Sequence, residues 1–83
     1  MSLSQIEKLI EKLKSKPTDF EYSELKRVMN HFGYKEREGT GSRKRFINDG
    51  GHTLTLHKPH KPPQLMPYQI KEVIEHLEER KLI

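Results

Sequence analysis

The stretch that decides the fold is YKEREGTGSRKRFINDGGHTLTLH, residues 34–57. Within it, three short segments typical of β-strands, residues 34–38, 43–47 and 52–57, alternate with two turn-forming segments. The second turn, Asn-Asp-Gly-Gly at 48–51, is a strong hairpin signal because Asn, Asp and Gly tolerate positive φ angles. The stretch therefore predicts a three-stranded antiparallel sheet.

Amphipathic helices are predicted before and after this sheet. Apolar residues recur at i, i+3, i+4 and i+7 in Ile6–Leu13, Leu25–Phe32 and Ile70–Leu77. Pro17 ends the first pattern, and Gly33 follows the second at a C-cap position. The order α-α-β-β-β-α predicts an α+β fold, in which the helices bury their apolar stripes against one face of the sheet.

The composition is that of a small basic protein. The 83 residues carry a formal net charge of +4, and 34% of them are charged. The absence of cysteine excludes disulfides and thiolate metal sites. No apolar run approaches about 18 residues and no signal peptide precedes the first helix, so we expect a cytoplasmic protein with no membrane role. The basic balance favours an anionic partner, either a nucleic acid or an acidic protein surface.

Strand periodicity gives the basic side chains a direction. Because side chains alternate across a strand, Phe46, Leu54 and Leu56 are predicted to face the core. The outward face then carries Lys35, Arg37, Arg43, Arg45, Thr53, Thr55 and His57. Such a face would bind phosphates through charge and hydrogen bonds, and Lys44 of the same basic run is a further candidate for holding a phosphate. The alternative is a solvated polar face without a ligand. Glu36 does not fit this assignment, because the same alternation points its charged side chain toward the core unless it lies at an edge of the sheet.

Histidines at positions 52, 57 and 60 lie close together in the sequence. His52 and His57 point to opposite faces of an ideal strand, and no cysteine assists them, so the sequence argues against a metal site and implies no cofactor. His57, at the outward end of the third strand, is the first candidate for acid–base catalysis at a ribose 2′-hydroxyl. His60, in the following loop, is the second. The alternative is that both are ordinary exposed histidines.

The Gly-Thr-Gly-Ser turn at 39–42 matches neither a Walker loop nor a dinucleotide fingerprint. Its peptide N–H groups could still hold one phosphate, but the turn alone is a weak signal.

Three runs of the sequence resemble one known family. They are ELKRVMNHFGYKEREGTGSRKRF at 24–46, HTLTLHKPH at 52–60 and PYQIKEVIEHLEE at 67–79. Together they resemble the HicA-like toxins, the mRNA interferases of type II toxin–antitoxin systems, over roughly residues 20–80. The resemblance implies a fold like that of a double-stranded-RNA-binding domain, α-β-β-β-α. Residues 1–17 are then an N-terminal helical extension of a single domain that spans residues 1–83.

The same resemblance implies a metal-independent endoribonuclease that cleaves mRNA and is neutralised by a HicB-like antitoxin. One position departs from the family pattern, because Arg43 stands where the family usually closes a Gly-Ser-His motif. Arginine cannot act as a general base at neutral pH. Either His57 or His60 has taken over the role, or the protein binds RNA without cutting it.

Three hypotheses remain open from the sequence. The first is a HicA-like ribonuclease in which RNA lies across the basic sheet face. The second is a non-catalytic RNA-binding module on the same fold. The third is a protein-interaction domain whose basic face docks an acidic antitoxin or another partner.

Overall fold

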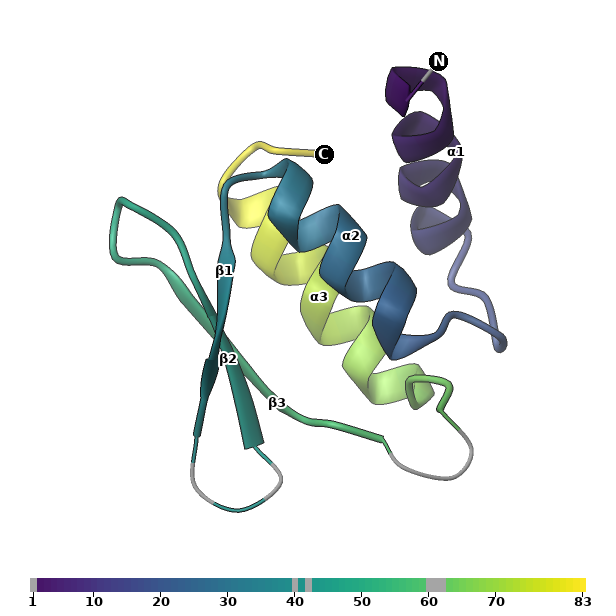
Figure 1. Cartoon of the computed structure of the whole chain (residues 1–83). Helices are drawn as coiled ribbons and strands as arrows, with labels where there is room; N and C mark the ends of the chain where they lie inside the picture. Colours follow the sequence, from purple (N-terminus) through teal and green to yellow (C-terminus); the bar gives the residue numbers. More distant parts are fainter. Residues whose placement is uncertain (1, 40, 42, 60–62) are drawn as a thin grey trace.

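A three-stranded antiparallel sheet forms one side of the molecule, and helices cover one of its faces (Figure 1). The computed structural model describes residues 2–39, 41, 43–59 and 63–83. In chain order the elements are α1 (Ser2–Lys14), α2 (Tyr22–His31), β1 (Lys35–Glu38), β2 (Arg43–Ile47), β3 (Thr53–His57) and α3 (Pro67–Glu79). The α+β, double-stranded-RNA-binding-domain-like fold with an additional N-terminal helix is confirmed.

The strands lie in the order β1-β2-β3, so β2 is central and pairs antiparallel with both neighbours. The first strand begins at Lys35, one residue later than the sequence predicts, because the backbone N–H of Tyr34 donates a hydrogen bond to the carbonyl of Met29 on α2 at 2.9 Å.

The third strand begins at Thr53, also one residue later than predicted. The reason is the hairpin turn, in which the backbone N–H of His52 donates a hydrogen bond to Asn48 Oδ1 at 2.9 Å. Gly51 in the same turn has a φ of 81°, a conformation that disfavours residues with a Cβ.

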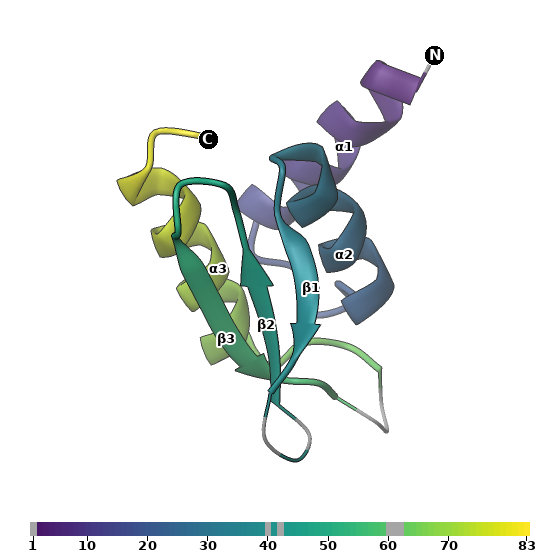
Figure 2. The same cartoon turned by 60° about the vertical axis from the view of Figure 1, so that its left-hand side comes forward.

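The molecule has three layers. The sheet is the first, α2 and α3 lie side by side on one face of it, and α1 packs on the far side of these two helices (Figures 1 and 2). The buried core lies between the layers and includes Phe46, Leu54, Leu56, Leu25, Val28, Met29, Ile70, Val73, Leu77 and Leu13. All the helices are therefore on one side, as predicted, and the other face of the sheet is left uncovered by them.

Glu36 does point toward the helices, and it lies in the edge strand β1. Its carboxylate accepts a hydrogen bond from the hydroxyl of Tyr22 and forms an ion pair with Lys26 at 3.5 Å. Burial would raise the pKa of the Glu36 carboxyl, but the hydrogen bond from Tyr22 and the charge of Lys26 outweigh it and hold that pKa below its usual range. The charge of Glu36, which the side-chain alternation directs toward the core, is thus paired at the edge of the sheet.

Helix α1 is fixed to the rest of the chain by apolar and ionic contacts. Leu9 and Leu13 are buried in the common core. Lys12 Nζ lies 3.0 Å from a carboxylate oxygen of Glu24 on α2. Glu24 in turn accepts a hydrogen bond at 2.9 Å from the backbone N–H of Glu21, so the ion pair is joined to the cap of α2. In the part of the chain that the structure describes, no helix is long and apolar enough to span a bilayer.

Candidate nucleic-acid interface

The uncovered face of the sheet carries the side chains that the strand alternation assigns to it. Figure 2 looks onto this face, with α2 and α3 behind the strands. Each member of the predicted outward set is exposed: Lys35, Arg37, Arg43, Arg45, Thr53, Thr55 and His57. We call this set the basic face. The predicted outward direction of these side chains is confirmed.

The strand register places the basic face in cross-strand pairs. Arg43 lies opposite His57, and Arg45 lies between Arg37 on one side and Thr55 on the other. Residues directly opposite each other have Cβ atoms about 4.5–5.5 Å apart, so these side chains act on one another. Like charges in such positions repel, and an anion placed over them would relieve the repulsion.

Backbone carbonyls hold two of these guanidinium groups near the strands. Arg37 Nη1 donates to the carbonyl of Glu36 at 3.1 Å, and Arg45 Nη2 donates to the carbonyl of Glu38 at 3.3 Å. A guanidinium has five N–H donors, so each group keeps donors for a phosphate.

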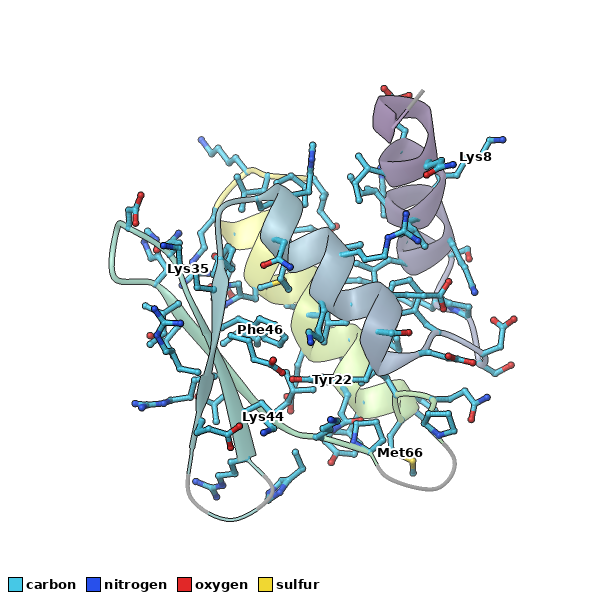
Figure 3. All side chains as sticks on the ribbon, viewed as in Figure 1. Lys8, Tyr22, Lys35, Lys44, Phe46 and Met66 are labelled. Atoms are coloured by element: carbon cyan, nitrogen blue, oxygen red, sulfur yellow. The ribbon has the colours of Figure 1, made fainter. Side chains whose placement is uncertain are left out.

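Lys44 does not join the basic face. It lies opposite Leu56 and Glu38, on the side of the sheet that faces the helices, where Figure 3 shows it near Tyr22. Its side chain is 16% exposed and forms an ion pair with Glu38. The physical reason is the period of two, which turns Lys44 to the face opposite Arg43 and Arg45.

A cleft of about 310 Å³ opens where the end of β3 meets the first two turns of α3. It is lined by Arg43, Thr55, Leu56, His57, Tyr68, Gln69 and Glu72. A second hollow of about 460 Å³ is lined by Glu38, Gly39, Arg43, Arg45 and Thr55. Arg43 and Thr55 line both, so the two hollows adjoin along the basic face and lead to His57.

Gln69 fixes the main chain at His57. Its Nε2 donates a hydrogen bond to the backbone carbonyl of His57 at 2.9 Å, and its Oε1 accepts one from the backbone N–H of Met66 at 2.9 Å. The Gln69 side chain is buried, so these bonds are shielded from water. The end of β3 and the start of α3 are therefore held together at the cleft. His60, the second catalytic candidate, lies outside the described residues.

The sequence interpretation missed the contribution of α3 to the cleft. Tyr68, Gln69 and Glu72 come from the N-terminal half of that helix, whose apolar stripe alone was recognised in the sequence. One signal was available, because Tyr68 and Glu72 are four residues apart and off that stripe, on one exposed side of the helix.

The remaining histidines lie elsewhere. The Nδ1 atom of His52 is 3.3 Å from the amide nitrogen of Asn48, within the hairpin turn. His76 is buried, and its Nε2 lies 2.8 Å from the hydroxyl of Tyr34. Burial, followed by the charge of Arg80, holds the pKa of His76 below its usual range.

No three or more carboxylate or imidazole side chains converge on a possible metal position among the residues that the structure describes. The phosphate-holding role considered for the turn at 39–42 involves Thr40 and Ser42, which also lie outside the described residues.

Comparison with known proteins gives one match. Residues 22–78 match the model of a family described as HicA toxin of bacterial toxin-antitoxin. No curated protein and no solved structure matches the chain. The matched range runs from the first residue of α2 almost to the end of α3, so it contains the whole sheet and both clefts and leaves α1 outside.

Proposed function

This chain belongs to the HicA toxin family of bacterial toxin–antitoxin systems, and on that premise we propose that it is a toxin that binds and cleaves RNA. A family member of this kind has a cognate antitoxin. We propose further that the RNA is mRNA, that cleavage takes place in the cytoplasm and needs no metal ion, and that the antitoxin is of the HicB type.

One observation carries the proposal: the basic face leads directly into the cleft at His57. Arg45, Thr55 and Arg43 follow one another along the adjoining hollows, and His57 lies opposite Arg43 in the strand register. Phosphates of a single strand would contact the arginines in turn. The same path would bring one phosphate between the guanidinium of Arg43 and the imidazole of His57.

The chemistry at that phosphate would be transesterification. The neutral imidazole of His57 takes the proton of a ribose 2′-hydroxyl, whose oxygen attacks the adjacent phosphorus. The bond from phosphorus to the 5′-oxygen breaks, and the imidazolium formed at His57 gives its proton to that leaving oxygen. Arg43 stabilises the additional negative charge on the phosphorane. The products are a 2′,3′-cyclic phosphate and a 5′-hydroxyl, and neither water nor a metal enters this step.

Cleavage of an RNA transcript by the purified protein tests the proposal, in the presence of a chelator. The variants are His57→Ala, His60→Ala and the double variant, with His31→Ala on α2 as the matched control. We expect a strong loss of cleavage in at least one active-site variant, unchanged cleavage in the control, and cyclic phosphate at the product ends. Undiminished cleavage by the double variant would overturn the histidine assignment.

Two other outcomes identify the alternative functions. Salt-sensitive RNA binding by the wild-type protein with no cleavage would show a non-catalytic RNA-binding module. Absence of RNA affinity at low salt, with capture of an acidic antitoxin by the basic face, would show a protein-interaction domain. A HicB-like reading frame beside the gene, and co-purification of its product, would support the proposed antitoxin.

A further inference from the structure

Tyr68 carries the most exposed tyrosine or phenylalanine ring in the part of the chain that the structure describes. It is 56% exposed, whereas the other tyrosine and phenylalanine rings are buried or half-buried. It stands in the first turn of α3 and lines the cleft together with His57 and Arg43. An aromatic ring that is left open beside cationic groups is the usual platform on which proteins stack an unpaired nucleobase.

Glu72 lies one helical turn beyond Tyr68 on the same side of α3. Glu72 lines the same cleft as Arg43, and the other carboxylate beside this arginine, that of Glu38, is paired with Lys44. A carboxylate repels phosphate, so its place in an RNA-binding cleft calls for a part of RNA that donates hydrogen bonds. The only such groups besides ribose hydroxyls are the N–H groups of the bases.

The cleft has the dimensions and boundaries of a small-ligand site. Its volume of about 310 Å³ falls at the lower end of the range typical of such sites, about 300–1,000 Å³. Leu56 and Tyr68 supply apolar surface, whereas Arg43 and Thr55 lie toward the basic face. A nucleotide whose phosphate contacts Arg43 would therefore have its base on the side of α3.

We propose that this cleft is a pocket for one unpaired guanine, stacked on Tyr68 and recognised by Glu72. The proposal rests on the RNA-binding function proposed above and assigns its base specificity. Guanine fits best because its N1–H and N2–H groups stand side by side on the Watson–Crick edge and match the two oxygens of one carboxylate. Adenine, cytosine and uracil lack this pair of adjacent donors. Both groups are paired in a duplex, so the target is single-stranded.

Fluorescence anisotropy with short RNA tests the proposal independently of cleavage. The probes are heptamers of uridine with or without one central guanosine, made with 2′-O-methyl riboses so that they cannot be cut. We expect the wild-type protein to bind the guanosine heptamer about tenfold more tightly than the uridine heptamer, since one bidentate contact to a base is of that order, whereas stacking on Tyr68 is open to either base. A uridine heptamer with one central inosine, whose base lacks the exocyclic amino group of guanine, should bind with an affinity between those of the other two.

The variants assign the two roles. Tyr68→Ala should weaken binding of both heptamers about tenfold, and Tyr68→Phe should bind both like the wild-type protein because the ring remains. Glu72→Gln should bind both heptamers with affinities within about twofold of each other, since one acceptor oxygen becomes a donor amide. Glu75→Gln is the matched control, because Glu75 is exposed on the same helix and lines a different pocket with Lys14 and Lys71.

Three results would overturn the proposal. One is equal affinity of the wild-type protein for the guanosine and uridine heptamers. Another is a guanine preference that survives both Tyr68→Ala and Glu72→Gln. The third is a Glu72→Gln protein that keeps the preference but no longer cleaves, because Glu72 would then be a catalytic residue. Failure of the proposed ribonuclease would leave the preference for guanosine intact, so the two proposals are distinguishable.

Discussion

The side-chain amide of Gln69 donates a hydrogen bond to the backbone carbonyl of His57 across 2.9 Å and so joins the sheet to α3 at the mouth of the cleft. The same side chain accepts a hydrogen bond from the backbone of Met66, which is the N-cap residue of the helix. One buried amide thus fixes the main chain at the catalytic candidate and at the start of the helix that forms the far wall.

Gln69→Ala should lower both stability and cleavage. Removal of the amide leaves the carbonyl of His57 and the N–H of Met66 without this partner, and such a loss in a buried position costs about 1–3 kcal/mol of unfolding free energy. Urea denaturation measures that loss. Cleavage should fall more than RNA affinity, because Arg37 and Arg45 are held by the backbone carbonyls of Glu36 and Glu38 and not by Gln69. An exposed glutamine on α1, Gln5, supplies the control substitution. A Gln69→Ala protein with wild-type cleavage would show that the bond does not position His57.

Neighbouring basic residues of β2 should respond differently to neutralisation. Arg45→Gln removes a cation from the basic face, so RNA affinity should fall and the slope of log K against log salt should become shallower by about 0.7. Lys44→Gln removes a cation that is paired with Glu38 on the opposite face, so that slope should stay the same. Titrations of single-stranded RNA at several salt concentrations measure both variants. Equal changes in slope would mean that Lys44 also reaches the RNA.

The sequence was sufficient for the sheet and for the direction of its side chains, because a period of two leaves one choice once Leu54 and Leu56 face the core. It was also sufficient for the helices, whose stripes follow the period of 3.6. It did not predict the cleft, because the cleft forms between β3 and α3, and no local pattern places Tyr68 beside His57. The ion pair of Lys44 was missed for a different reason. A run of three basic residues suggests one common role, but the alternation along β2 turns Lys44 to the face opposite Arg43 and Arg45.

Acid should destabilise the protein partly through His76. Burial and the charges of Arg80 and His52 hold the pKa of this imidazole below its usual range, against the opposite influence of Glu79. The unfolded chain therefore binds a proton near pH 6.5 that the folded chain resists, so unfolding free energy falls as pH decreases through that value. The full contribution is present above the unfolded pKa. One proton accounts for a slope of at most about 1.4 kcal/mol per pH unit.

The His76 contribution can be isolated by comparing unfolding at pH 7.5 and pH 5.5. His76→Gln, which keeps a hydrogen-bonding partner for Tyr34, should show a smaller decrease between the two pH values than the wild-type protein. His31→Gln is the control, because His31 is exposed at the end of α2. If both variants show the same decrease as the wild type, other groups cause the acid sensitivity and the buried imidazole does not.

Helix α1 lies outside the family match, yet Leu13 on this helix is fully buried in the common core. Leu13→Ala should therefore lower unfolding free energy by about 2–5 kcal/mol, as is usual for a leucine truncated in a core. Because α1 lies across α2 and α3 from the basic face, RNA affinity per folded molecule should not change (Figure 1). Lys8→Ala, at the exposed side of α1 in Figure 3, should leave stability within about 0.5 kcal/mol of the wild type. Denaturation and RNA titration of the same samples separate the two effects. A loss of RNA affinity in folded Leu13→Ala protein would show that α1 supports the binding surface as well as the core.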